Sequence, residues 1–290
     1  MSKLIRAISK NGGVIICVVD SSDIVSKMEE YHKTSATASA ALGRLLTAAS
    51  LMGSMLKEDD CGISLKINAN GAIGSMYAVS DSVGNVRGYC DNPLADMPLN
   101  PANQKLNVGG IVGTQGALTV TRDFGTRASY SGETKLVSGE IAEDIAAYYA
   151  KSEQIPTACA LGVLVNTDLT IRVAGGYLLQ LLPGASDEEI ALIEKNIKCA
   201  RSVTEMLNDN KSVYDIISVI LRGFDPEVLS ESQVEYKCNC SEEKMTKALI
   251  SIGRDEIARL ADEQDETEVV CSYCNKRFIY KREELLQLFG

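Results

Sequence analysis

The chain has 290 residues, 45% of them hydrophobic, and carries 29 basic against 39 acidic side chains, which gives a net charge of -10. This length favours a main domain with a smaller appendage, and the apolar content is sufficient for a buried core. The negative charge argues against nucleic acid or anionic lipid as a partner. Leu106–Thr121, the longest stretch without charge, is too short and too polar to cross a membrane, so we expect no membrane partner.

Strand-like runs separated by glycine-rich turns dominate residues 1–183. They lie at Val14–Val19, Ile63–Ile67, Gly74–Val79, Ala117–Thr121 and Leu169–Ala174. Thr34–Lys57 is apolar on most sides and predicts a core helix, and a second helix is predicted from Ser138 to about Ser152. The pattern predicts an α+β domain over residues 1–183.

Two other features of this domain could suggest a function, but we assign none to them. The glycines of Gly109–Gly116 imitate a phosphate-binding loop, but they precede a strand instead of opening a helix, which favours a simple turn. His32, the only histidine, lies in a polar stretch, and we expect it to be solvated.

Residues 184–232 have the pattern of an amphipathic helical linker. Ser186 and Glu189 form a capping box, and one apolar stripe follows it down a single predicted helix, through Ile190, Ile193, Ile197, Ala200, Val203 and Leu207. Ser212 is expected to cap a shorter helix with its own apolar face. Both apolar stripes must be buried against another part of the protein. Permanent packing on a neighbouring domain is the simplest way to bury them.

Nine cysteines without a signal sequence indicate a reducing compartment, where close cysteine pairs hold metal or do redox work more often than they form structural disulfides. Five of them lie singly and mostly in apolar surroundings, which is typical of buried, inert thiols: Cys17, Cys61, Cys90, Cys159 and Cys199.

The other four cysteines lie in residues 233–290, as C-x-C and C-x-x-C: Cys238, Cys240, Cys271 and Cys274. Residues two apart in an extended segment point to the same side, and C-x-x-C presents two thiolates from a tight turn. A helix capped by Ser241 and ended by Gly253 is predicted between the pairs. The spacing predicts a small domain that holds one zinc ion per chain through four thiolates, with four free thiols or two disulfides as the alternative.

Such a site has no open coordination position, so it argues against a hydrolytic centre and against an enzyme. Zinc keeps its ligands as thiolates, the form that oxidants attack, and oxidation abolishes ligation. Structural zinc contributes on the order of 10 to 16 kcal/mol in small finger peptides, against ~5 to 15 kcal/mol for the net stability of a whole domain. We therefore expect loss of the metal to unfold residues 233–290.

Two other functions use similar motifs. A zinc ribbon that binds nucleic acid would use the basic cluster Lys276–Arg282, yet acidic side chains outnumber basic ones after Glu231. A thiol oxidoreductase would need Cys271 at the start of a helix, whereas the surrounding VVCSYCNKRFIY predicts a strand and a turn.

Four segments resemble one known family, the redox-regulated thirty-three-kilodalton heat-shock chaperones. Its zinc-binding tail is similar to VEYKCNCSEEKMTKALISIGRDEI at Val234–Ile257 and to VVCSYCNKRFIYKREEL at Val269–Leu285. The end of its amino-terminal domain is similar to YYAKSEQIPT at Tyr148–Thr157 and to AGGYLLQLLPGA at Ala174–Ala185. The resemblance extends over most of the chain.

The resemblance implies an ATP-independent holdase without catalytic residues, which prevents aggregation of unfolding client proteins under oxidative stress. Such a protein is inactive when reduced and zinc-bound, and oxidation releases zinc and forms the disulfides Cys238–Cys240 and Cys271–Cys274. Family members are cytoplasmic, and their active form tends to be a homodimer. The family's linker corresponds to residues 184–232, whose apolar stripes would be covered in the resting state and exposed to clients when the zinc domain melts.

Overall fold

A computed structural model describes residues 2–56, 58, 60–125 and 128–288. The chain forms two compact units, Met1–Lys237 and Cys238–Gly290. The α+β class expected from the sequence is confirmed in the described part of the chain. None of the helices in these residues is long and apolar enough to cross a membrane.

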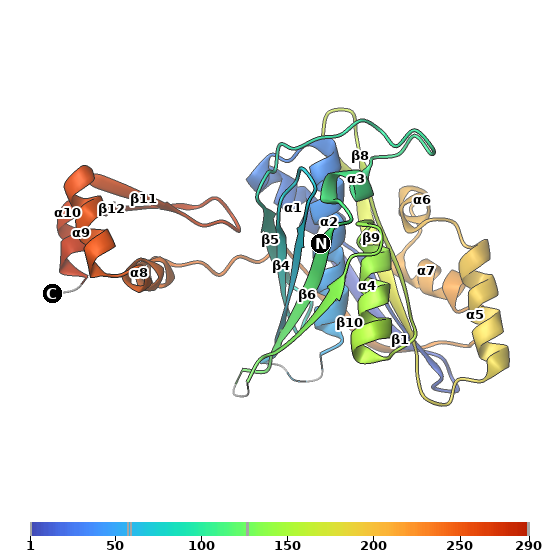
Figure 1. Cartoon of the computed structure of the whole chain (residues 1–290). Coiled ribbons are helices and arrows are strands. Elements are labelled where there is room, and N and C mark those ends of the chain that lie inside the picture. The colour runs from blue at the N-terminus through green and yellow to red at the C-terminus, as the bar shows by residue number, and fades with distance from the viewer. Residues whose placement is uncertain (1, 57, 59, 126–127, 289–290) are drawn as a thin grey trace. The chain divides into compact units, whose positions relative to one another are not determined.

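Two antiparallel five-stranded sheets form the frame of the first unit (Figure 1). The first sheet contains β1 (Ser2–Ile8), β2 (Val14–Asp20), β8 (Thr157–Val165), β9 (Ile171–Leu181) and β10 (Glu227–Val234), in the order β10-β1-β2-β9-β8. The second contains β3 (Gly62–Ala69), β4 (Met76–Asp81), β5 (Val86–Cys90), β6 (Gly116–Asp123) and β7 (Tyr130–Lys135), in the order β5-β4-β3-β6-β7. Both β10 and β5 are therefore edge strands.

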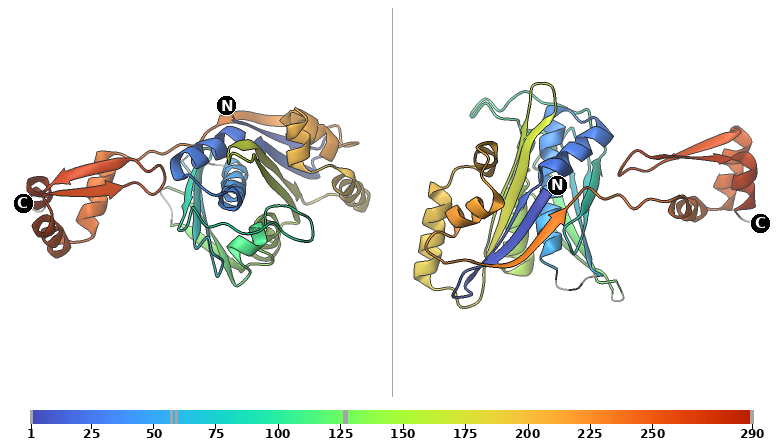
Figure 2. Two further views of the ribbon diagram at one scale, coloured as in Figure 1. Left: turned by 90° about the horizontal axis from the view of Figure 1, so that it is seen from above. Right: turned by 180° about the vertical axis from the view of Figure 1, so that it is seen from behind.

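A buried helix separates the two sheets. Helix α2 (Ala36–Ser54) follows α1 (Ser22–His32), and every residue of α2 except Ala36 and Arg44 is buried. The view from above in Figure 2 shows α2 between the sheets. The core helix predicted over Thr34–Lys57 is confirmed, although its predicted last residue lies outside the described part of the chain.

Small residues allow α2 to pack closely on its neighbours. A Cβ atom on Gly43 would lie 2.7 Å from the Val25 Cγ1 atom, and one on Gly53 would lie 2.3 Å from the Ser80 Oγ atom. Both separations are shorter than van der Waals contact. A larger side chain at either position would therefore force the helix away from α1 or from the second sheet.

Two predicted strands begin later than expected. The strand predicted from Gly74 begins at Met76, and the strand predicted from Leu169 begins at Ile171. Gly74 and Leu169 have φ angles of 72° and 70°, in the left-handed region. This backbone conformation belongs to turns and is incompatible with a regular strand.

The helix predicted from Ser138 begins only at Ala142. It consists of α4 (Ala142–Tyr148) continued by the π-helix η1 (Tyr149–Glu153). The buried Asp144 carboxylate accepts backbone N–H bonds from Val137, Ser138 and Ile141, which holds the preceding residues in a turn.

The turn predicted over Gly109–Gly116 is wrong for its first half. A short helix, α3 (Val108–Val112), occupies it, and the Asn107 side chain caps this helix by accepting the Gly110 N–H at 3.0 Å. The capping side chain satisfies an N–H group that the first turn of a helix cannot pair internally.

The first sheet carries an apolar core on each of its faces. One face packs with α1, α2 and the second sheet, and includes Leu4, Cys17, Val19 and Leu178. The other face packs with three later helices, and includes Ile5, Val14, Ile16, Val18 and Leu179. We call the first the inner core and the second the outer core.

The three helices over the outer core are α5 (Asp187–Cys199), α6 (Val203–Asn208) and α7 (Val213–Ile220). The single helix predicted along the stripe from Ile190 to Leu207 is wrong, because the chain is extended at Ala200 (ψ 142°) and Ser202 starts a new helix with its own capping box. The stripe itself still faces the sheet. Val203 and Leu207 are buried beside Ile193, and α7 buries four further apolar side chains.

The second unit is a β-hairpin with three helices. Its elements are α8 (Glu242–Ser251), α9 (Arg254–Glu263), β11 (Glu266–Val270), β12 (Arg277–Lys281) and α10 (Arg282–Gln287). The predicted helix after Ser241 and the predicted strand and turn are confirmed. Among the described residues its core contains only seven buried side chains: Leu249, Ile257, Ala261, Cys271, Phe278, Tyr280 and Leu285. So small a core stabilises a domain poorly without a metal or another cross-link.

Candidate metal centre

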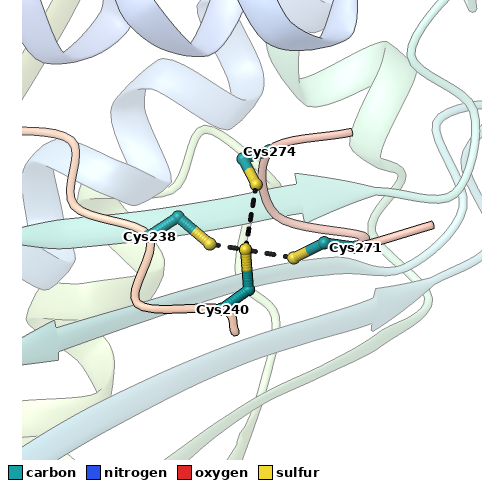
Figure 3. A group of neighbouring side chains, drawn as sticks. All are labelled: Cys238, Cys240, Cys271 and Cys274. Carbon is teal, nitrogen blue, oxygen red and sulfur yellow. Dashed lines mark hydrogen bonds between the residues drawn. The ribbon is translucent and has the colours of Figure 1, made fainter. Parts of the chain in front are cut away.

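Four cysteine side chains converge on one point in the second unit (Figure 3). They are the four predicted from the C-x-C and C-x-x-C motifs: Cys238, Cys240, Cys271 and Cys274. All four Sγ atoms lie within 4.8 Å of one another, and no other group of metal-binding side chains is found among the described residues.

The sulfur separations fit a tetrahedral metal. The Sγ atoms of Cys238 and Cys271 are 3.7 Å apart, and those of Cys240 and Cys274 are 3.5 Å apart. A tetrahedral zinc ion with Zn–S bonds of ~2.3 Å has S···S edges of about 3.8 Å. A disulfide would need about 2.05 Å. The four residues are thus arranged as free thiols at the spacing of a four-sulfur metal site.

A tight turn positions Cys271 and Cys274. The turn joins β11 to β12, and the Cys271 carbonyl oxygen accepts the Asn275 N–H at 2.9 Å. The Cys271 N–H in turn donates to the Lys276 carbonyl oxygen at 3.0 Å. Asn275 has a φ of 56°, in the left-handed region that asparagine tolerates better than most residues. The hairpin therefore holds both sulfur atoms on one side of the turn.

The C-x-C segment leads directly into α8. Ser241 caps this helix by accepting the Lys244 N–H, and the Lys244 ammonium group donates to the Asn239 carbonyl oxygen at 2.9 Å. The Tyr280 hydroxyl donates to the Glu242 carbonyl oxygen at 3.2 Å and so ties the start of α8 to β12. These bonds fix the C-x-C segment opposite the hairpin turn.

Burial disfavours the thiolate at all four sites and determines the direction of the pKa shift at three of them. It raises the pKa of Cys238 to about 11, and it also raises the pKa of Cys240 and of Cys274. Burial acts in the same direction at Cys271, but hydrogen bonds from the Tyr273 and Cys274 N–H groups and from neighbouring thiols outweigh it and lower its pKa. A divalent cation would supply the positive charge that four clustered thiolates need.

The five single cysteines all belong to the first unit. Cys17, Cys61 and Cys90 are buried and Cys159 is half-buried, as the sequence suggested, whereas Cys199 is exposed at the end of α5 and contradicts the expectation of a buried thiol. Burial raises the pKa of Cys17, Cys90 and Cys159 to about 12.

His32 is not simply solvated, as its polar surroundings had suggested. The imidazole is half-buried, and its Nε2 atom lies 3.5 Å from the Tyr236 hydroxyl. Tyr236 was not selected from the sequence, although an aromatic residue two positions before Cys238, between charged neighbours, was the available signal.

The family model and the similar proteins all indicate the same family. Residues 2–281 match the family model described as Hsp33 protein. The 33 kDa chaperonin of Clostridium perfringens strain SM101 is 43% identical over 286 residues, which cover 99% of this chain and 90% of that protein. The 33 kDa chaperonin of Clostridioides difficile strain 630 is 43% identical over 285 residues, 98% and 97% of the two chains.

A solved structure agrees with these relatives. The crystal structure of the 33 kDa chaperonin from Thermotoga maritima superposes with a TM-score of 0.91 at 35% identity, covering 99% of this chain and 97% of that one. The match includes both compact units and the four-cysteine group. The chain belongs to the Hsp33 family, which is a family of chaperones and not of enzymes.

Proposed function

We propose that this chain is a redox-regulated, ATP-independent holdase of the cytoplasm, which binds unfolding proteins under oxidative stress and prevents their aggregation. The observation that carries the proposal is the group of four thiols in a unit with seven buried core residues. A unit built in this way depends on its sulfur atoms for stability, so their oxidation acts directly on its fold.

In the resting state we assign one zinc ion to Cys238, Cys240, Cys271 and Cys274. The S···S separations of 3.5 and 3.7 Å support this assignment, as does the four-sulfur donor set, which favours zinc over harder cations. Bound zinc would contribute a closed structural cross-link between the C-x-C segment and the β-hairpin.

Oxidation would convert the four thiolates into the disulfides Cys238–Cys240 and Cys271–Cys274. Each cysteine pair loses two electrons as its S–S bond forms, and one molecule of hydrogen peroxide takes them up with two protons from the solvent to give two molecules of water. The zinc would leave as Zn²⁺. In the reduced structure sulfur atoms of the two segments lie close together, Cys238 with Cys271 at 3.7 Å and Cys240 with Cys274 at 3.5 Å. Pairing within each motif would thus abolish the link between the segments and unfold the unit.

We assign the client-binding surface to the outer core. We propose a division into a core domain at 1–183, a linker at 184–232 and a zinc domain at 233–290, in which α5, α6 and α7 of the linker act as a cover over the first sheet; their packing on the outer core supports this role. Its release would expose Ile5, Ile16 and Val18 of the sheet, all of which are fully buried. An exposed apolar surface of this kind would bind unfolded protein segments. It would also bind a second copy of the chain in an oxidised homodimer.

The test measures light scattering of a heat-denatured client with reduced or peroxide-treated protein, and counts zinc release in the same samples. We expect suppression of aggregation only after oxidation, together with release of about one zinc per chain, as a single four-thiolate site requires. Peptide mapping identifies the disulfides. Zinc release without suppression would contradict the holdase, and suppression by the reduced protein would contradict redox control.

The position of C-x-x-C argues against a thiol oxidoreductase. Cys271 and Cys274 lie in the turn of a β-hairpin, whereas a reactive cysteine of this type is activated at the start of a helix. Failure to reduce insulin disulfides is the expected result.

A further inference from the structure

Tyr236 anchors the chain immediately before the first cysteine of the metal centre. It follows β10, which pairs with β1 over the whole length of that strand, from Ser2 with Val234 to Ile8 with Glu227. Figure 2 shows β10 beside β1 at the edge of the first sheet. Only Lys237 separates Tyr236 from Cys238, so their Cα atoms lie within about 7 Å of each other.

The side chain of Tyr236 is buried in the inner core. The residue is 8% exposed, and its ring packs edge to face on Tyr31 with 5.4 Å between the ring centroids. Its hydroxyl donates to the Gly88 carbonyl oxygen at 2.8 Å and accepts the Gly88 N–H at 3.2 Å. A tyrosine hydroxyl can do both at once, so both backbone groups of Gly88 are satisfied by one side chain.

Residues 235–237 pair with an edge strand of the second sheet. The Val86 N–H donates to the Glu235 carbonyl oxygen at 3.0 Å, and the Lys237 N–H donates to the Val86 carbonyl oxygen at 2.8 Å. Together with Tyr236 they satisfy the outward-facing backbone groups of Val86 and Gly88 on β5. Residues 235–237 are thus fixed to the edge of the second sheet, directly after β10, which pairs with the first sheet, and all of these bonds lie within the first unit.

The strand before Tyr236 is itself weakly packed. Within β10 only Val234 is buried, so the strand is held mainly by its backbone pairing with β1. Glu231 of β10 accepts a hydrogen bond from the Tyr214 hydroxyl of α7 and pairs with the Lys3 ammonium group at 2.6 Å. Displacement of β10 would therefore disturb α7 and, through it, the cover of the outer core.

We infer that Tyr236 is a latch, which resists the spread of unfolding from residues 238–288 into β10 and the attached α7, so that release of the cover requires the latch to break as well. Unfolding that begins at the cysteine group reaches Tyr236 before it reaches β10, because Tyr236 lies between them in the chain. The latch does not depend on the folded second unit, since its contacts are all in the first unit: Tyr31, His32, Val86 and Gly88. This inference deepens the proposed function and rests on it only for the event that unfolds the second unit.

The test uses hydrogen exchange, read by mass spectrometry over β10 and over residues 238–288 of the full chain. Cys271→Ser with Cys274→Ser removes two of the four thiols and should unfold the second unit while β10 keeps its protection. Adding Tyr236→Phe leaves Gly88 without its hydroxyl partner and should accelerate exchange in β10 about 10-fold. Tyr236→Ala should accelerate it about 100-fold or more, because the buried ring is lost as well.

The matched control is Tyr130→Phe, which alters an exposed tyrosine of β7 and should leave β10 unchanged. The latch is excluded if β10 loses protection in the double cysteine variant while Tyr236 is intact. It is equally excluded if both Tyr236 substitutions leave the rate of exchange in β10 unchanged. That result must hold both in the double cysteine variant and in the chain with all its cysteines. Continued protection of residues 238–288 in the cysteine variant would instead contradict the proposed metal centre, and the Tyr236 variants of the unsubstituted chain still report on the latch.

Discussion

The Asn196 side-chain amide of α5 donates to the Arg222 carbonyl oxygen at 2.8 Å, just beyond the end of α7. The same nitrogen donates to the Ile220 carbonyl oxygen at 3.0 Å. These bonds link the first helix of the cover to the last one. They also satisfy carbonyl groups that the end of a helix leaves without an internal partner.

Replacing Asn196 with alanine should loosen α5. Both bonds are lost, so we expect the free energy that holds α5 in place to fall by about 1 to 3 kcal/mol. Hydrogen exchange in α5 of the reduced protein should accelerate, while exchange in α2 should not change. Lys195→Ala, at an exposed position of the same helix, is the control. Equal exchange in both variants would show that the amide bonds do not hold the cover.

A charge at Ile193 should detach α5 completely. Ile193 is the only residue of α5 that is fully buried, and it lies against the outer core. Burying an unpaired carboxylate there costs more than the helix gains by docking, so Ile193→Asp should expose α5 in the reduced protein. Binding of a hydrophobic dye should rise without peroxide treatment. Glu194→Asp is the control, since Glu194 is exposed.

Removing one ligand should unfold the second unit. Cys271→Ser should lower the zinc content well below one ion per chain, because a hydroxyl is a poor substitute for the thiolate in a structural zinc site. Circular dichroism should show loss of helix from α8, α9 and α10. Cys199→Ser should keep its zinc and its helix content. If Cys271→Ser retained one tightly bound zinc ion, the four-thiolate assignment would be wrong.

The single cysteines should differ sharply in their reactivity. Burial raises the pKa of Cys17 to about 12, so roughly one thiol in 10,000 is ionised at pH 8. Cys199 is exposed. Brief treatment of the folded protein with iodoacetamide at pH 8 should therefore label Cys199 and spare Cys17 and Cys159. Comparable labelling of Cys17 would mean that the inner core opens within the labelling time.

The parts of the fold that depend on local pattern were predictable from the sequence. The C-x-C and C-x-x-C spacings identified all four cysteines of the candidate metal centre, because each pair lies within a few residues of the chain. The helix capped by Ser241 and the core helix α2 were also predicted, since capping and composition act within one or two turns. The zinc ion, the oxidation of its four cysteines and the domain division remain predictions for experiment.

The parts that depend on distant partners were not predictable. β10 reads EVLSESQV, a sequence with few apolar residues, and it becomes a strand because β1 offers an open edge far away in the chain. Tyr236 and Gly88 are 148 residues apart, so nothing near Tyr236 indicates its partner. The break at Ala200 escaped prediction for another reason, since the apolar stripe continues in register across two separate helices.

The first sheet also separates the inner core from the outer core. Along β2, Cys17 and Val19 point to one side, while Ile16 and Val18 point to the other. Loss of packing on one side therefore leaves the other side in place, because the hydrogen-bonded backbone between them stays intact. We therefore expect the outer layer to detach and return without loss of the inner core, which calorimetry should record as a separate, reversible transition at a lower temperature than the melting of the α2 layer.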